Sequence, residues 1–334
     1  MNRYYDFNRI RSYNRMYNMI VGARGCGKSY GAKRIAIKNF LKSNGREQFV
    51  YVRRYKSEIK EDKKFDNFFD DIREEFPEHE LTIRGNKAYC DGKLMGYAIP
   101  LSTAVGIKSV PYPFVTMIIF DEFILDTGYN YLSNEPLKFL DLCSTIVRDR
   151  NNVRIFLLAN NVTVANPYYE FWGICPKKND RFVNINEECI LEQITNDDFV
   201  KSLQENKFTK LIKNTDYYKF NILNESINDS EDYIATYKRG ELSDKFVIYC
   251  TDTPIQISFT NDMKIFCHQK INKTCNIYNI DIANLKEGHI VMTNSEKTMM
   301  LTLVEFLREG NLLFENPLVK QKVIMFIKKL GLRI

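Results

Sequence analysis

The stretch from Met19 to Arg34 constrains this chain more than any other. A short apolar run, Met19 to Val21, is followed by glycines and then by Lys28 and Ser29, in the spacing G-x-x-x-x-G-K-S. Glycines let backbone N–H groups turn inward around a phosphate chain, and a helix that starts there adds its N-terminus. The sequence therefore predicts a strand, a phosphate-binding loop and a helix. The predicted ATP-binding loop consists of Gly22, Ala23, Arg24, Gly25, Cys26, Gly27, Lys28 and Ser29.

Two side chains of this loop have predicted tasks. Lys28 reaches the β- and γ-phosphates, and the hydroxyl group of Ser29 binds Mg²⁺, so ATP and Mg²⁺ are the expected cofactors. The bare motif also fits a chance loop with a solvated lysine. The strand before it and the helix after it favour the nucleotide site.

A second part of the site is predicted where a buried strand ends. Residues Phe114 to Phe120 form an almost continuous apolar run, as in parallel strands buried on both faces. Asp121 follows and is predicted to hold Mg²⁺. Glu122 is predicted to be the general base that activates water. An ordinary loop with two acids is the alternative. The glutamate favours a hydrolase over a small-molecule kinase, in which a second substrate replaces water.

Polar residues around the next strand complete the predicted site. Asn160 ends the run from Val153 to Asn161 and is predicted to hydrogen-bond the γ-phosphate or the attacking water, with Asn161 as the competing residue. Arg148 and Arg150 precede this strand. Both are candidates for an arginine finger, which stabilises transition-state charge and can come from a neighbouring subunit.

A basic cluster follows the second predicted strand. Arg53, Arg54 and Lys56 lie at the same predicted sheet edge as the phosphate loop. They can face phosphates, nucleic acid or water, and the sequence leaves these three alternatives open.

The order of elements predicts two domains. Strands and helices alternate over about the first 200 residues, which indicates a doubly wound α/β domain. The expected helices and strands of this part are 30–42, 48–55, 57–75, 114–120, 136–147 and 153–161, with a hairpin over 81–100 and an irregular loop over 101–113. Short strands and the helices 298–308 and 317–330 then indicate a smaller α+β unit. The expected boundaries are 1–197 for the first domain, 198–230 for a linker and 231–334 for the second domain.

The charge, the cysteine content and the lengths of the apolar runs limit the partners that the chain can have. The net charge of +6 over 334 residues is compatible with a polyanionic partner. Eight cysteines without a C-x-x-C pair, together with three histidines, argue against a zinc site and fit reduced thiols in the cytosol. No apolar run approaches the roughly 20 residues that span a bilayer, so no membrane partner is expected.

Several segments of the chain resemble those of a known family. The segments GARGCGKSY, QFVYVRRYK, EFPEHEL, DGKLMGYAIPLS, IIFDEF, VRDRNNVR and ANP, in this order, are similar to the DNA-packaging (encapsidation) ATPase of small short-tailed bacteriophages. The resemblance implies an ASCE-type P-loop ATPase domain in a homomeric ring, a pentamer, that pumps double-stranded DNA through the portal into an empty capsid. It also implies Walker A at 22–29, Walker B at Asp121 and Glu122, and Arg148 as the finger acting between subunits. Lys56 and Lys108 match basic positions near the interface or the DNA, and Arg150 is a further candidate for such contacts.

The resemblance of the C-terminal half is limited to length and layout. It implies a vestigial, nuclease-inactive RNase H-like domain that docks on the portal or on a scaffold RNA. The implied location is the host cytoplasm, with transient binding at the portal vertex. The alternative in the same chemistry is a helicase-like or chromosome/plasmid-pumping DNA translocase. An alternative of another class is a nucleotide-dependent scaffold that does not hydrolyse, against which Glu122 argues.

Overall fold

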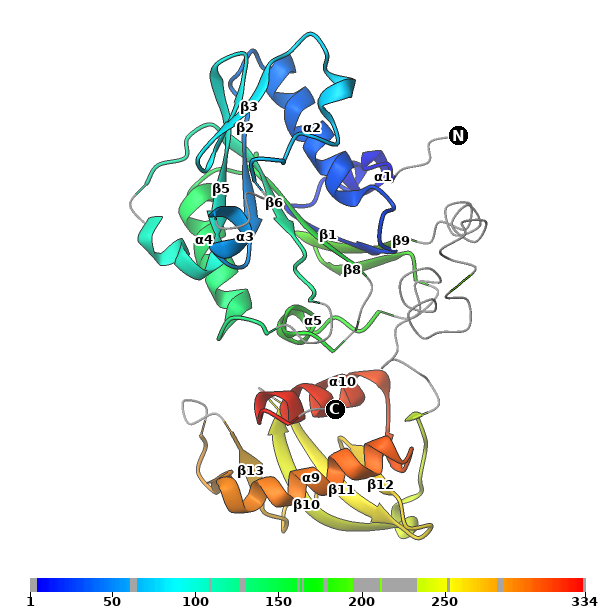
Figure 1. The fold of residues 1–334 in the computed structure, drawn as a ribbon. Helices are drawn as coiled ribbons and strands as arrows, with labels where there is room; N and C mark the ends of the chain where they lie inside the picture. Colours follow the sequence, from blue (N-terminus) through cyan, green and yellow to red (C-terminus); the bar gives the residue numbers. More distant parts are fainter. Residues whose placement is uncertain are drawn as a thin grey trace. The chain divides into compact units, whose positions relative to one another are not determined.

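The protein consists of two compact units (Figure 1). The computed structural model describes residues 5–60, 65–107, 110–125, 130–160, 163, 165–176, 180–194, 211, 233–250, 253–280 and 285–332. Unit 1 comprises Met1–Val162 and Pro176–Ile227, and unit 2 comprises Thr163–Cys175 and Asn228–Ile334. Each unit is described separately below.

Unit 1 is built on a nine-stranded sheet in the order β3-β4-β5-β2-β6-β7-β1-β9-β8. The six strands from β5 to β9 in this order run parallel, and β3, β4 and β8 are joined at the two edges by antiparallel pairing with their neighbours. The strands are β1 (Tyr17–Gly22), β2 (Gln48–Arg53), β3 (Leu81–Arg84), β4 (Lys87–Cys90), β5 (Lys93–Pro100), β6 (Val115–Asp121), β7 (Arg154–Asn160), β8 (Phe182–Asn186) and β9 (Cys189–Ile194).

The order of the central strands defines the class of sheet. β7 lies between β1, which leads into the phosphate loop, and β6, which ends in Asp121. An additional strand between the Walker A and Walker B strands is the arrangement of ASCE-type P-loop domains. The expected α/β fold with a mostly parallel sheet is confirmed.

Helices cover both faces of this sheet (Figure 1). The core on one face joins α2 to the sheet through residues such as Ile37 and Ile119. Phe120, the next residue on β6, points to the other face and packs on Phe139 with ring centroids 4.9 Å apart. The helical elements of unit 1 are α1 (Asn8–Ser12), α2 (Lys28–Lys42), α3 (Ser57–Lys60), the 3₁₀ helices η1 (Arg73–Glu75) and η2 (Leu101–Ile107), and α4 (Glu135–Val147).

The long helix expected over 57–75 is wrong for the residues that the structure describes. Only α3 and η1 are helical there, and residues 65–72 form successive turns. In two of these turns Phe68 N donates to Phe65 O at 3.0 Å and Ile72 N donates to Phe69 O at 3.1 Å. All four side chains are buried, and Phe65 and Phe68 stack on aromatic residues of β2. Packing against the sheet overrides the helical spacing.

Two other expectations need adjustment. The hairpin over 81–100 is a three-stranded meander that turns at Gly85-Asn86 and Asp91-Gly92, as the turn residues predict, and joins the main sheet through β5. The loop expected over 101–113 begins with η2 instead of irregular backbone. Strands β8 and β9 are not among the expected elements, although β9 pairs along the whole of β1.

Unit 2 contains a six-stranded sheet in the order β14-β13-β10-β11-β12-β15. β10, β11 and β12 are antiparallel neighbours, and β13 and β14 follow parallel to β10. The Asn261-Asp262 turn lies between β11 and β12, as expected. The elements are η4 (Arg239–Glu241), β10 (Leu242–Cys250), β11 (Thr253–Thr260), β12 (Ile265–His268), β13 (Ile277–Asn279), β14 (His289–Val291), α9 (Asn294–Arg308), β15 (Leu312–Phe314) and α10 (Pro317–Lys329).

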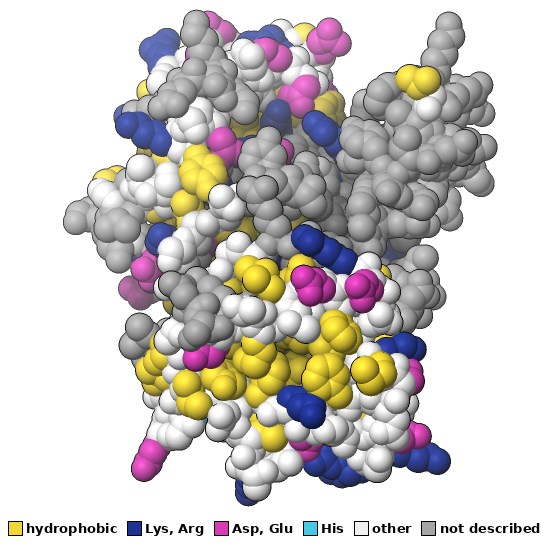
Figure 2. Space-filling model, turned by 60° about the horizontal axis from the view of Figure 1, so that its bottom comes forward, with side chains coloured by type: hydrophobic (Ala, Val, Ile, Leu, Met, Phe, Trp, Pro, Cys, Tyr) yellow, Lys and Arg dark blue, Asp and Glu magenta, His cyan; other side chains and the backbone are white. Residues whose placement is uncertain are grey.

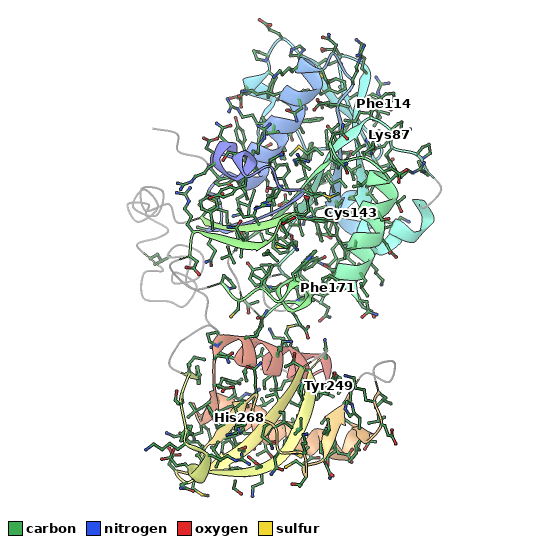
Figure 3. The ribbon with its side chains drawn as sticks, turned by 180° about the vertical axis from the view of Figure 1, so that it is seen from behind. Lys87, Phe114, Cys143, Phe171, Tyr249 and His268 are labelled. Atoms are coloured by element: carbon green, nitrogen blue, oxygen red, sulfur yellow. The ribbon has the colours of Figure 1, made fainter. Side chains whose placement is uncertain are left out.

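A polar network lies within this sheet. His268 is on β12 (Figure 3), and its Nε2 lies 3.0 Å from Ser258 Oγ. Ser258 and Asn272 both donate to Asp244, which also pairs with Arg239. The pKa of Asp244 is lowered to about 2, first by the hydrogen bond from Arg239. The Asp244 carboxylate is thus held by protein donors.

The structure assigns one segment differently from the expected boundary at 197. Helix α5 (Pro167–Trp172) belongs to unit 2, because it packs on α10. Ala165 is buried against Ile324 and Met325, and Glu170 pairs with Lys329 at 3.0 Å. Such contacts between distant residues leave no local pattern in the sequence. The expected linker over 198–230 lies outside the described residues, apart from Leu211.

Exposed apolar side chains interrupt the charged surface of the molecule. Figure 2 shows hydrophobic side chains gathered on one face, with Lys and Arg side chains beside them. In unit 2 the large exposed ones among the described residues are Phe171, Phe259, Met263, Leu285, Ile290 and Leu301. Among the described helices, none is long and apolar enough to cross a membrane.

Candidate nucleotide site

The phosphate loop connects β1 to α2, and its glycines meet two separate requirements. Gly25 and Gly27 have φ angles of 81° and 87°, in the left-handed region that favours glycine. Gly22 instead meets a close neighbour, because a Cβ atom there would lie 2.7 Å from the Cβ atom of Ile194 on β9. The loop therefore depends on glycine for its turn and for its fit against the sheet.

Lys28 closes the loop on itself. Its Nζ lies 3.0 Å from Gly22 O, 2.8 Å from Ala23 O and 3.3 Å from Asn160 Oδ1. The side chain is buried, and all three partners are neutral acceptors. Asn160, at the end of β7, thus lies beside the lysine that the motif assigns to the phosphates. The positive charge of Lys28 remains available to an anion.

Ser29 and Asp121 meet as the magnesium prediction requires. Ser29 Oγ donates to Asp121 Oδ1 at 3.0 Å. Tyr51 on β2 donates to the other carboxylate oxygen, Oδ2, also at 3.0 Å. Burial, followed by the charge of Asp121, raises the pKa of the Tyr51 phenol well above its usual value. Tyr51 consequently keeps its proton and orients Asp121.

The set of oxygens around Asp121 fits Mg²⁺. Mg²⁺ prefers oxygen ligands and is held in proteins by one or two protein groups besides phosphates and water. A hydroxyl and a carboxylate oxygen 3.0 Å apart supply such a pair. When bound, Mg²⁺ neutralises charge on the phosphates.

Glu122 has an unusual backbone and a basic partner. Its φ of 62° is uncommon for a residue other than glycine. Its Oε2 lies 2.7 Å from Arg53 Nη2, and Arg53 also pairs with Glu58 at 2.6 Å. The Glu122 side chain is 54% exposed, so water reaches it. The other oxygen of this carboxylate, Oε1, makes no hydrogen bond or ion pair with the described residues and can accept a hydrogen bond from water.

Arg54 fixes the backbone beside Glu122. Its guanidinium donates to Glu122 O and Phe123 O, both at 3.0 Å, and forms two bonds of 2.7 Å to Glu135 at the start of α4. Arg54 and Glu135 are both 1% exposed. The sequence left open whether Arg54 faces phosphates, nucleic acid or water, and the structure supports none of the three. Arg54 is buried and holds the end of β6 in place.

The structure separates the two candidates for the arginine finger. Arg150 donates to the carbonyl oxygens of Tyr112, Pro113, Val115, Ile146 and Val147, at distances of 2.5 to 3.3 Å. Arg148 follows α4 with a φ of 48°, and its exposed side chain makes no hydrogen bond or ion pair with the described residues. Arg150 therefore stabilises the fold, whereas Arg148 has no such structural role among the described residues.

The remaining predicted residues are scattered. Arg24 is exposed in the loop, whereas Ala23 and Cys26 are buried in it. Lys56 is exposed between β2 and α3. Lys108 and Asn161 lie outside the described residues.

Sequence reasoning missed two residues of this site, Tyr51 and Glu135. Tyr51 is one aromatic residue among many in a strand-forming run, and Glu135 is one acid at the start of a helix. The spacing of the motifs contains no signal for either. The one indication is the strand order, because Tyr51 lies on β2, the strand next to β6, which ends in Asp121.

The fold and the site together define a class: a P-loop NTPase domain of ASCE type with Walker A, Walker B and an adjacent glutamate. The family described as Podovirus DNA encapsidation protein (Gp16) matches residues 1–331, and the chain belongs to this family. The DNA packaging protein of Bacillus phage B103 is 38% identical over 325 residues, covering 96% of this chain and 98% of the relative. The DNA packaging protein of Bacillus phage phi29 is 35% identical over 340 residues, covering 99% and 98%.

Solved structures agree with this assignment. A chain of the bacteriophage phi29 viral genome packaging motor assembly superposes with a TM-score of 0.77 at 34% identity, covering 98% of this chain and 99% of that one. The crystal structure of the N-terminal domain of the phi29 DNA packaging ATPase has a TM-score of 0.53 at 45% identity, covering 57% of this chain and 96% of that one.

Proposed function

We propose that this chain is the ATP-hydrolysing subunit of a homomeric ring that moves double-stranded DNA through a portal into a capsid. One observation carries the chemistry: Ser29, Asp121 and Tyr51 share a single hydrogen-bonded chain at the phosphate loop. The relatives named for DNA packaging and for the packaging motor support the biological role, and they favour it over a helicase-like or chromosome-pumping translocase.

Each residue then has a role in hydrolysis. Lys28 and the loop N–H groups bind the β- and γ-phosphates of ATP, with Asn160 beside them. Ser29 and Asp121 hold Mg²⁺. Glu122 accepts a proton from the attacking water through Oε1, the oxygen that is not paired with Arg53. Arg148 of the neighbouring subunit stabilises the charge of the transition state.

Motion is coupled to this cycle through basic residues. Lys56, three residues beyond β2, and Lys108 are the proposed contacts to DNA or to the neighbouring subunit, and Arg150 keeps only the structural role described above. Contacts of this kind bind the phosphate backbone without regard to sequence and weaken with salt. Unit 2, with its exposed apolar side chains, is proposed as the nuclease-inactive docking domain for the portal or a scaffold RNA.

The test is Glu122→Gln in the full-length chain, assayed with double-stranded DNA and portal-bearing capsids. Nucleotide binding should persist, while hydrolysis should fall about 10²- to 10⁴-fold, because general-base catalysis contributes that much. Glu58→Gln is the matched control, since it removes the other carboxylate on Arg53 but leaves the base in place.

Two results would count against the proposal. Native turnover in Glu122→Gln would reject Glu122 as the base. Hydrolysis by the native chain that never protects DNA from nuclease in the presence of capsids would reject the packaging role.

A further inference from the structure

A pocket of about 330 Å³ opens at the end of the sheet where the parallel strands begin, opposite the end that carries the phosphate loop. It lies where β1 and β7 begin, since Tyr17 pairs with Ile155 there, whereas Gly22 and Asn160 pair at the nucleotide end. Along the six residues of β1 the two ends are about 17 Å apart. The pocket is lined by Asn8, Arg11, Ser12, Asn14, Arg15, Asn18, Arg154 and Phe156.

The lining is cationic and contains no carboxylate. Arg11, Arg15 and Arg154 supply three guanidinium groups, and none of them pairs with an acid among the described residues. Elsewhere in the same unit, arginines such as Arg34 and Arg181 do pair with acids. Three uncompensated positive charges around one pocket attract an anion.

Neutral acceptors hold two of these arginines in place. Arg154 donates to the backbone carbonyls of Asn151 and Val153 at 3.1 and 3.3 Å and to the side chain of Asn14. Arg15 donates to the carbonyl of Glu187. Such partners orient a guanidinium without cancelling its charge. The pocket is therefore preorganised for a ligand that brings negative charge.

Two buried polar atoms of the lining lack partners among the described residues. They are Arg15 Nε, a donor, and Asn18 Oδ1, an acceptor, and Asn18 is only 1% exposed. The amide nitrogen of Asn18 already donates to Arg15 O at 2.9 Å, so the oxygen is the atom left over. A buried polar atom without a partner is costly and indicates a missing ligand group.

We propose that this pocket binds a phosphate group, supplied by a small phosphorylated molecule or by the backbone of double-stranded DNA. The planar fork of a guanidinium matches phosphate oxygens in pairs, and three of them suit a doubly charged group. In a phosphate monoester, a protonated oxygen or a neighbouring hydroxyl group supplies the donor that Asn18 Oδ1 lacks, whereas a DNA phosphodiester supplies only acceptors for the guanidinium groups. Phe156 is 2% exposed and offers no face for a base, so the group recognised is the phosphate.

The first arm of the test measures binding of inorganic phosphate to the full-length chain by calorimetry. Lys28→Ala is the background, because it weakens the competing site in the phosphate loop. Adding Arg11→Gln and Arg154→Gln should weaken phosphate binding about tenfold or more, as expected for lost charge-assisted hydrogen bonds. Arg46→Gln, at an exposed arginine far along the sequence from the pocket, is the matched control.

The second arm measures binding of a short DNA duplex against salt concentration, with the same variants in the native background. The slope of log K against log salt is negative, and each lost phosphate contact should reduce its magnitude by about 0.9. A reduced magnitude identifies the DNA backbone as the ligand, and weaker phosphate binding with an unchanged slope identifies a small molecule. If both measurements match those of Arg46→Gln, the proposal is wrong. Arg11→Gln alone keeps the test valid should Arg154→Gln disturb folding, since Arg11 makes no side-chain hydrogen bond with the described residues.

Discussion

At the scale of single residues, Tyr51 decides how the two oxygens of Asp121 are used. The phenol holds Oδ2, and Oδ1 faces Ser29. Groups that orient a metal ligand are as necessary as the ligand itself, because they fix its direction before the metal binds. Tyr51 is thus a positioning residue for the proposed magnesium site.

We expect Tyr51→Phe to raise the Mg²⁺ concentration that half-saturates ATP hydrolysis by about 10- to 100-fold, the usual cost of losing an outer-shell partner. The ring contacts with Phe65 and Phe68 remain, so the fold should persist. Magnesium titrations of the hydrolysis rate measure the effect, with Tyr97→Phe on β5 as the control. An unchanged half-saturation would show that Tyr51 does not orient Asp121.

At the scale of elements, the N-terminal segment is packed tightly on α2. A Cβ atom at Gly31 would lie 2.6 Å from the ring of Phe7. Phe7 cannot easily move away, because it is 3% exposed and packs edge-on against Tyr5 and Phe156. This packing leaves no room for a side chain at Gly31, the fourth residue of α2, which explains why glycine stands there in spite of its poor helix propensity.

We expect Gly31→Ala to destabilise the chain, although alanine favours a helix by about 1 kcal/mol. Overpacking in a filled core costs about 1–3 kcal/mol, which outweighs that gain. Urea unfolding measures the free energy. In a Phe7→Leu background, where the ring is absent, the same change should become less harmful or stabilising. A more stable Gly31→Ala in the native background would contradict the packing argument.

The elements differ in how well the sequence predicts them. α2, expected over 30–42 and observed over 28–42, follows from glycines before it and a helical spacing within it. The region 65–76 also has helical spacing, but its aromatic rings stack on β2 and the backbone follows them into turns. Local spacing predicts an element only where no stronger contact from elsewhere in the chain competes with it.

At the scale of the whole molecule, the proposed ring places the loop and the finger of one chain in different active sites. Arg148 has no partner among the described residues of its own chain, which suits a group that works on a neighbour. A shared site means that two different defects can complement each other.

We expect a mixture of Arg148→Ala and Lys28→Ala subunits to recover part of the ATPase activity that each variant loses. A working site needs the loop of the first and the finger of the second, and about a quarter of the interfaces in an equal mixture have this pairing. Steady-state ATPase assays on mixed and separate rings measure the recovery. No recovery from rings that assemble normally would reject a finger acting between subunits.

Arg150→Ala serves as the comparison for this experiment. It should lower the free energy of unfolding by about 1–3 kcal/mol, because five carbonyl oxygens, at sites that are mostly part-buried, lose this donor. When mixed with Lys28→Ala subunits, Arg150→Ala subunits should give no more ATPase activity than subunits with the native finger give. A normal stability for this variant would undermine the structural role of Arg150.

The sequence by itself determined the phosphate loop, Asp121 and Glu122, the alternation of strands and helices, and the family. These features are local: glycines, lysine and serine within eight consecutive residues, or two acids directly after one apolar strand, specify their own chemistry. Tertiary structure decided the partner of Glu122, the contacts of Tyr51 and Arg54, the carbonyl partners of Arg150, and the place of α5. Each of these depends on side chains brought together from separate elements, and a contact through space leaves no spacing that a single sequence can display.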